Sequence, residues 1–335
     1  MDEQYTDVLK QERKSMKIGF VGLGNVGAKL AGSLLRNGFD LIVMDLDHEK
    51  VQRFVDRGAH TLDTPKQLAQ HCDVIITCLP SPQACARVLE NDNGIIAGLS
   101  KTKIWMEMST TDSEEVQRIG SKVIATGALP LDCPVSGGCH RADTGNISIL
   151  AGGERIAFDK ALPLLTTMGR RVIHTGKLGT ASSIKVLTNY LATAHLASLA
   201  EAWAVSTKVG IDPNVAYEAI KISSGNSFVH ETESQVILNG SRDISFTMDL
   251  VLKDLSLFQK LADQHDVALE ISPLLIDIFK DGQEQFGTRE WSSNIIKRLE
   301  KKYGIVVRGK GFPALLSDDE PEQSGYEVVV RNRSD

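Results

Sequence analysis

The sequence predicts a doubly wound α/β domain followed by an all-α domain that begins with one long helix. Two observations carry this prediction. In the first half, short runs that are apolar along their whole length alternate with amphipathic stretches, as in a parallel sheet covered on both faces. After Gly176 only helical segments follow, and the first of them, 181–209, contains no Pro or Gly.

The individual elements follow from these patterns. The predicted strands are 17–21, 41–45, 73–79, 103–108, 129–132, 147–151 and 171–175. Helices are predicted over 25–36, near 48–57, from about 112, and over 155–168, 213–222, 229–238, 248–265, 273–286 and 291–303. The resulting domains are an N-terminal extension (1–15), a nucleotide-binding domain (16–178), an all-α domain (179–303) and an acidic tail (304–335). We expect the tail to wrap the surface or to be partly disordered.

The composition excludes several classes of protein. Of 335 residues 24% are charged, and the net charge of −6 argues against a nucleic-acid partner. No apolar run is long enough for a membrane span, and the charged N-terminus does not resemble a secretory signal. The five cysteines lack metal-type spacing, so we expect reduced thiols, no metal site and a cytoplasmic protein. Residues 1–15 are either a leader without function or precede a true start at Met16.

A glycine-rich segment, GLGNVG at 22–27, follows the first predicted strand and opens the first predicted helix. In this context GxGxxG is the fingerprint of a Rossmann dinucleotide site: the glycines permit a tight turn, close approach to the pyrophosphate and close helix–strand packing. Asp45 ends the next strand, where a carboxylate accepts from the ribose hydroxyls and repels a 2′-phosphate, so NAD is favoured over NADP. The predicted cofactor-binding residues here are Gly22, Gly24, Asn25, Val26, Gly27 and Asp45.

Four sequence blocks together resemble the β-hydroxyacid dehydrogenase (3-hydroxyisobutyrate dehydrogenase-like) family. They are the glycine block from 19 to 38, DCPVSGG at 132–138, GTASSIKVLTN at 179–189 and KDL at 253–255. The resemblance covers about 17 to 292 and implies a Rossmann domain, a helical domain and homodimers or homotetramers joined through the helical parts. The tail after Tyr303 exceeds the family's usual end.

Lys185 is the candidate acid/base residue. It lies between Ile184 and Val186 on a mostly apolar helix, where desolvation favours a neutral amine, and Asn189 lies one turn further on the same face. The resemblance implies that Lys185 is the catalytic lysine and Asn189 its neighbour in the substrate site. Without it, the spacing alone favours a lysine that snorkels from a buried helix, with Asn189 merely tolerated there.

Other residues are assigned from the same blocks. Ser136, Gly137 and Gly138 form a small loop whose hydroxyl and amides suit a substrate carboxylate, although without the other motifs a plain Gly-Gly turn explains it equally well. Arg141 departs from the family's small residue, and it either contacts a substrate oxyanion or forms an ion pair between loops. The resemblance implies that Lys253 adds a positive charge near the carboxylate or the nicotinamide; without the resemblance, a surface ion pair with Asp254 is the favoured interpretation. We also assign Leu79, Pro80 and Thr110, at the carboxyl ends of two strands, to the cofactor, and suggest Asn226, Phe228 and Phe246 as pocket residues.

These residues predict an NAD-dependent enzyme that oxidises the 3-hydroxyl of a short 3-hydroxy acid or a polyhydroxy acid such as threonate. One alternative is a reductase of semialdehydes or sulfonate-aldehydes. A different alternative is a non-catalytic NAD-binding scaffold, against which Lys185 argues. An imine reductase is less favoured because such enzymes usually lack the lysine.

Overall fold

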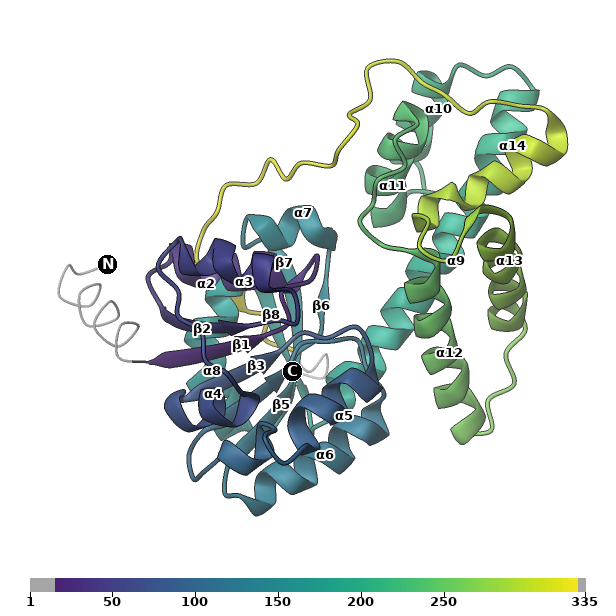
Figure 1. Ribbon diagram of the computed structural model, residues 1–335. Helices are drawn as coiled ribbons and strands as arrows, with labels where there is room; N and C mark the ends of the chain where they lie inside the picture. The colour runs from purple at the N-terminus through teal and green to yellow at the C-terminus, as the bar shows by residue number, and fades with distance from the viewer. Residues whose placement is uncertain (1–15, 331–335) are drawn as a thin grey trace. The chain divides into compact units, whose positions relative to one another are not determined.

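The computed structural model describes residues 16–330, so the predicted extension at 1–15 lies outside the described residues. The chain divides into two compact units (Figure 1). Of the described residues, 16–185 and 318–330 form the sheet unit, and Val186–Ser317 form the helical unit. The change from one unit to the other falls within a helix, between Lys185 and Val186, whereas the sequence prediction placed it at 178/179.

Within the described residues the sheet has nine strands. Their order is β2-β1-β3-β4-β5-β7-β8-β9, with β6 paired to β7. The strands from β2 to β5 in this order are parallel, β7 runs antiparallel to β5, and β8 and β9 are parallel to β7. The bounds are β1 Lys17–Val21, β2 Asp40–Met44, β3 Val74–Thr77, β4 Ile104–Glu107, β5 Leu129–Asp132, β6 Val135–Ser136, β7 Ile147–Gly153, β8 Gly169–Gly176 and β9 Tyr326–Glu327.

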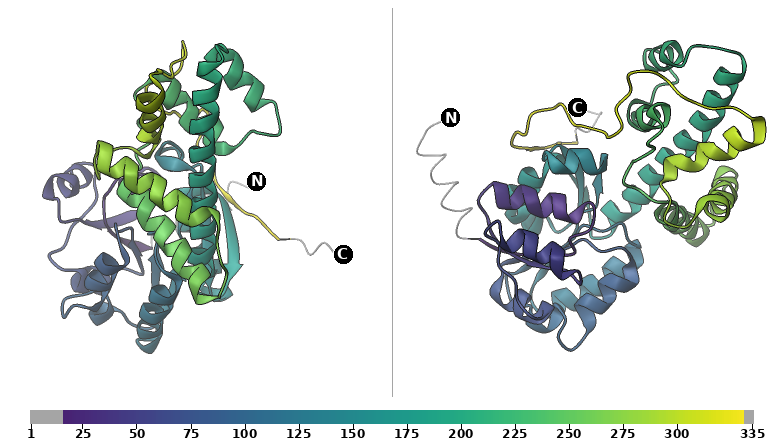
Figure 2. Two further views of the ribbon diagram at one scale, coloured as in Figure 1. Left: turned by 90° about the vertical axis from the view of Figure 1, so that its right-hand side faces the viewer. Right: turned by 45° about the horizontal axis from the view of Figure 1, so that its top comes forward.

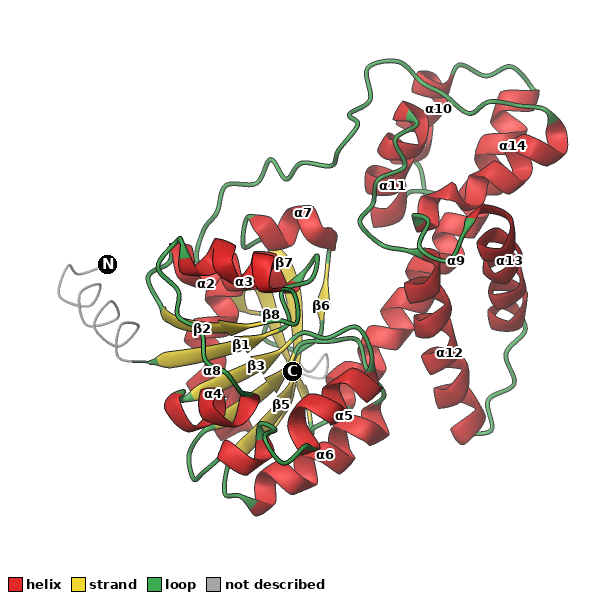
Figure 3. Ribbon diagram, in the orientation of Figure 1, coloured by secondary structure: helices red, strands yellow, loops and turns green. Residues whose placement is uncertain are grey.

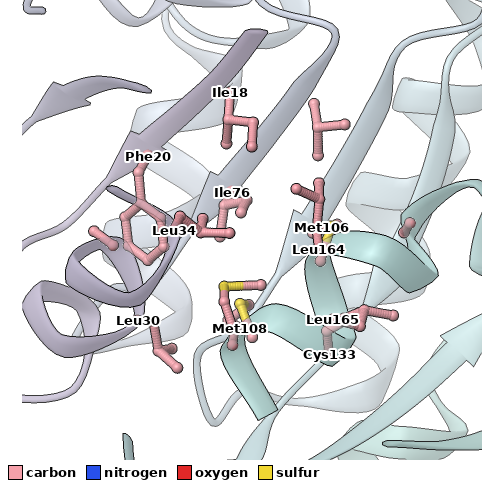
Figure 4. Packing of buried hydrophobic residues seen from close by; sticks show 14 of the residues in the cluster. Ile18, Phe20, Leu30, Leu34, Ile76, Met106, Met108, Cys133, Leu164 and Leu165 are labelled. Atoms are coloured by element: carbon pink, nitrogen blue, oxygen red, sulfur yellow. The ribbon is translucent and has the colours of Figure 1, made fainter. Parts of the chain in front are cut away.

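Helices cover both faces of the sheet, as the doubly wound fold requires (Figure 3). Alternate strand residues supply the two cores. Ile18, Phe20 and Ile76 pack with α2 and α8 (Figure 4), whereas Ile75 and Trp105 pack with α4, α5 and α6. The helices of this unit are α2 Gly27–Arg36, α3 His48–Val55, α4 Pro65–His71, α5 Pro82–Glu90, α6 Ser113–Ala125, α7 Gly138–Asp143 and α8 Arg155–Met168, with a 3₁₀ turn η1 at Ile96–Gly98.

Most predicted elements are confirmed, but α4, α5 and α7 are absent from the sequence prediction. The first two begin with a polar cap followed by proline: Thr64 accepts from the Gln67 amide and Ser81 from the Ala84 amide. That pattern is a strong helix-start signal. The six-residue helix α7 has no side-chain cap and begins at Gly138, the last residue of the predicted substrate loop.

The helical unit is built on α9, Thr180–Lys208, which runs unbroken for 29 residues (Figure 2). Trp203 of this helix is buried against α11 and donates from its indole to Ser234 at 3.1 Å. The remaining helices are α10 Pro213–Lys221, α11 Phe228–Asn239, α12 Met248–Gln264, α13 Ile271–Phe286 and α14 Lys297–Tyr303, with a 3₁₀ turn η2 at Ser292–Ile296. None of the helices in 16–330 has the length and apolar character needed to cross a membrane.

The segment after Tyr303 is not one independent tail. Val307 is buried in the core of the helical unit, and residues up to Ser317 belong to that unit. Residues 318–330 belong to the sheet unit, where β9 pairs with β8. The sequence prediction contained no strand there, because a two-residue strand exists only through its partner.

Candidate functional site

The carboxyl ends of five strands lie in one row. In register, Met44 pairs with Val21, Val21 with Thr77, Thr77 with Glu107, and Glu107 with Asp132. With strands about 4.8 Å apart, the step from β1 to β5 spans roughly 14 Å. The loops that follow these residues therefore emerge along one edge, where ligands bind in open α/β sheets.

The glycine-rich loop follows β1, the second strand of this row. Gly22 has φ +102°, and a Cβ there would lie 2.2 Å from the Cys78 carbonyl oxygen. A Cβ on Gly27 would lie 2.1 Å from the Gly22 oxygen, whereas one on Gly24 would meet nothing within 4 Å. Gly22 and Gly27 therefore close the turn, and Gly24 leaves open space in front of the backbone. Helix α2 has no side-chain cap at Val26, which leaves its amino end suited to phosphate.

Asp45 follows β2 and is tied to the same loop. Its Oδ2 accepts from the Leu23 amide at 2.6 Å and its Oδ1 from the Asp47 amide at 2.9 Å. Each carboxylate oxygen has two acceptor sites, so the ribose hydroxyls of a dinucleotide can still donate to it. The loop, the helix end and the carboxylate together fit a dinucleotide.

The loops after β3 and β4 are joined by a buried carboxyl group, Glu107. It accepts hydrogen bonds from the Ser109 amide at 2.8 Å, from the Thr77 hydroxyl at 2.9 Å and from the Cys85 thiol. Ser109 in turn accepts from the Leu79 amide at 2.7 Å. Burial raises the pKa of Glu107, because these hydrogen bonds only partly replace the hydration that the carboxylate loses.

This network holds two segments predicted to bind the cofactor. Leu79 is half-buried and Pro80 is exposed, and Thr110 follows Ser109 as a half-buried residue. Sequence reasoning missed Glu107 itself. The available signal was its position within the apolar run KIWMEM (103–108). An acidic residue in such a run is rarely buried without hydrogen-bond partners, so its presence indicates a polar network.

The predicted substrate loop lies beyond β5. Ser136 is in the short strand β6, and Gly137 and Gly138 have φ +130° and +86°, values that favour glycine. Arg141 lies on α7, directly after this loop. A Cβ on Gly137 would lie 3.5 Å from the Arg141 Cδ, and an Arg141 Nη2 lies 3.7 Å from the Glu320 Oε1. Of the two roles expected for Arg141, the structure contains the ion pair.

Asp132 fixes the start of the helix that carries Lys185. Its Oδ1 accepts from the Gly179 amide at 2.8 Å and its Oδ2 from the Ser182 amide at 2.7 Å. It is fully buried, and this burial raises its pKa although both amides stabilise the carboxylate. Lys185 comes three residues after Ser182, about 4.5 Å further along the axis, and only 7% of it is exposed. Lys185 is therefore buried, about one helical turn beyond the residue that Asp132 anchors to the carboxyl end of β5.

The helical unit contains the other predicted residues. The Asn189 side-chain amide donates to the Asp254 Oδ2 at 2.5 Å, and the Lys253 ammonium lies 3.0 Å from the Asp254 Oδ1. Asp254, which is buried, therefore links Asn189 to Lys253 through its two carboxylate oxygens. Asn226 donates to Glu231 at 2.7 Å, Phe228 is exposed at the start of α11, and Phe246 packs against the helical core.

Comparison with known proteins agrees with this geometry. Residues 17–176 match the family model of the NAD-binding domain of 6-phosphogluconate dehydrogenase, and 179–299 match that of the NAD-binding domain of NADP-dependent 3-hydroxyisobutyrate dehydrogenase. The chain is 33% identical to L-threonate dehydrogenase of Cupriavidus necator over 88% of this chain and 99% of that one.

The chain belongs to the β-hydroxyacid dehydrogenase family. It is also 31% identical to 2-(hydroxymethyl)glutarate dehydrogenase of Eubacterium barkeri over 88% of this chain and 99% of that one. A structure of 3-hydroxyisobutyrate dehydrogenase from Salmonella typhimurium superposes with a TM-score of 0.77 at 27% identity, over 84% of this chain and 99% of that one. The protein is accordingly an NAD(P)-binding oxidoreductase with a small-molecule substrate.

Proposed function

We propose that the protein oxidises the 3-hydroxyl of a short 3-hydroxy acid, or of a polyhydroxy acid such as threonate, with NAD. The single observation that carries the proposal is the placement of Lys185. It is buried on the first turns of α9, and Asp132 anchors that helix to the carboxyl edge of the sheet.

In the proposed mechanism, bound NAD would serve as the acceptor of the hydride from the substrate. The Lys185 Nζ takes the proton that leaves the substrate hydroxyl. Asn189 donates one side-chain N–H to Asp254, and it either donates the other N–H to the substrate hydroxyl oxygen or orients the lysine. Ser136 and the Gly137 and Gly138 amides bind the substrate carboxylate.

The cofactor preference rests on Asp45. Its carboxylate stands after β2 and is held by the Leu23 and Asp47 amides, so it would meet a 2′-phosphate with like charge. We therefore propose NAD over NADP. Lys253, whose ammonium is paired with Asp254, is proposed to lie toward the nicotinamide half.

A substrate panel tests the function. Reduction of NAD is measured with 3-hydroxyisobutyrate, threonate and 2-(hydroxymethyl)glutarate, each with wild type and Lys185→Ala. We expect turnover of at least one acid by wild type and a large loss in the variant. No turnover of any acid, with NAD binding intact, would instead favour the non-catalytic scaffold.

The reverse direction is a second candidate, because the same proton can return from Lys185 to a bound aldehyde. Rates with NADH and succinic semialdehyde or sulfolactaldehyde, set beside the rates of oxidation, distinguish a reductase from a dehydrogenase. A higher kcat/KM for an aldehyde than for every acid would reverse the proposed direction.

We further propose a cytoplasmic homodimer or homotetramer. None of the five cysteines forms a disulfide bond, which suits a reducing compartment. Three apolar side chains along α9 are exposed, Leu187, Leu191 and Val205, and Val209 directly after the helix is exposed as well. Light scattering on the purified protein measures the assembly, and a monomer at every concentration would refute it.

A further inference from the structure

The segment from Asp318 to Val330 is a built part of the sheet unit, although both family models end before it. The Val328 amide donates to the Val172 oxygen at 2.7 Å and the Gly325 amide to the Thr166 oxygen at 2.8 Å. A Cβ on Gly325 would lie 2.0 Å from the Gly169 oxygen, so the backbone crosses the start of β8 at close range. We call residues 318–330 the returning segment.

Its first carboxylate holds the end of helix α7. Asp318 accepts from the Thr144 hydroxyl and, at 2.7 Å, from the Asn146 side-chain amide, which also donates to the Glu320 oxygen at 2.8 Å. Thr144 caps α7 and Asn146, which is buried, precedes β7. The returning segment therefore fixes the helix that follows the predicted substrate loop.

Another carboxylate joins the same segment to the nucleotide-binding helix. Glu322 lies 3.4 Å from Arg36 and accepts from the Asn37 amide at 3.2 Å, both at the end of α2. Arg36 also donates to the Asp143 carbonyl oxygen of α7 at 2.5 Å, and Lys29 forms an ion pair with Asp143 at 3.1 Å. These contacts give Glu320 a defined position.

Glu320 forms an ion pair with Arg141, and the Asp318 carboxylate also interacts electrostatically with this guanidinium. The Glu320 and Arg141 side chains lie 3.7 Å apart and are 45% and 27% exposed, so a solute anion can compete for the guanidinium. The Arg141 Cδ lies beside the Gly137 backbone, so this positive charge stands next to the loop proposed to bind the substrate carboxylate.

We propose that Glu320 determines specificity by occupying Arg141. This inference rests on the proposed role of the Ser136–Gly138 loop. A substrate with a single carboxylate binds without disturbing the pair, whereas a second carboxylate must displace Glu320 before it reaches Arg141. The returning segment thereby biases the protein toward hydroxy acids that carry one negative charge.

The test is a binding measurement that needs no turnover. Dissociation constants for glutarate, with two carboxylates, and butyrate, with one, are measured by calorimetry on the full chain with NAD present. In Glu320→Gln we expect glutarate to bind about fivefold more tightly, the upper value of an exposed ion pair, with butyrate unchanged. Glu322→Gln is the matched control: it removes the same charge from the same segment, but its partners are on α2.

A gain of the same size in Glu322→Gln overturns the inference, since it would reflect net charge alone. An equal gain for both acids, unchanged glutarate binding, or binding of neither acid also overturns it. Arg141→Ala combined with Glu320→Gln must abolish the gain, because no guanidinium is left to be released. If the glutarate effect holds and no hydroxy acid is oxidised, the proposed function fails and this inference stands.

Discussion

Replacing Asp132 separates the anchoring of α9 from the chemistry of Lys185. In Asp132→Asn one side-chain oxygen still accepts an amide, but the new NH₂ group faces either the Gly179 or the Ser182 N–H. One hydrogen bond is lost, the other is no longer charge-assisted, and the backbone N–H and the new NH₂ group are left as two donors facing each other. A loss of this kind costs about 1–3 kcal/mol, and the free energy of unfolding should fall by that amount.

The effect on turnover should be larger than the effect on cofactor affinity. Asp132 contacts the helix three residues before Lys185, so a shift of that turn moves the amine directly. A misplacement of about 1 Å is enough for a loss of roughly 10²-fold in rate. The glycine-rich loop lies on β1, three strands away, and the affinity for NAD should stay close to that of wild type.

Urea unfolding gives the stability, steady-state kinetics give kcat, and fluorescence titration gives the NAD affinity. Ser183→Ala is the control, because Ser183 lies in the same turn and donates only to the Gly179 carbonyl at 3.1 Å. If Asp132→Asn unfolds at the wild-type urea concentration and keeps wild-type kcat, the anchoring role is refuted.

Three further predictions concern the nucleotide side of the sheet. Gly24→Ala should fold like wild type but lose NAD affinity, because a Cβ there fills only open space. Gly27→Ala should lose thermal stability as well, because its Cβ would collide with the Gly22 oxygen. Equal melting temperatures of the two variants would contradict this difference. Asp45→Asn should lower the ratio of kcat/KM for NAD over NADP by about tenfold, which corresponds to 1.4 kcal/mol, and an unchanged ratio would remove Asp45 from cofactor choice. Because burial raises the pKa of Glu107, its carboxyl group holds the proton more tightly in the native state than in the unfolded chain. The resulting contribution to stability is present below the ordinary pKa of 4.5 and is lost as pH rises through the folded pKa. Glu107→Gln should lack that decline in urea titrations at successive pH values, and parallel curves for the two proteins would show that Glu107 does not titrate as argued.

The sequence determines much of the fold through local signals. Strands such as Lys17–Val21 are apolar throughout, and the turn at Gly22–Gly27 has a glycine at each position where a side chain would collide or fill the phosphate space. These signals are read from neighbouring residues, so a single chain reveals them. The helix starts at Pro65 and Pro82 carried signals of the same kind that the prediction did not use.

Other features depend on partners that are distant in sequence. The helix α7 is held by Asp318, and β9 exists only beside β8, so neither is visible in its own residues. The roles of Glu107 and Asp132 likewise come from the strand register that places them in one row. A sequence motif marks the position of Asp132, but only the folded chain shows which amides it binds.

The central claim is that the Lys185 amine moves the proton in the reaction. The most direct measurement is the single-turnover rate of NAD reduction in Lys185→Ala and Lys185→Arg, with NAD affinity measured on the same samples. A general acid/base contributes about 10²–10⁴-fold, so both variants should lose that much in rate while NAD affinity changes little. A wild-type rate in either variant would contradict the account.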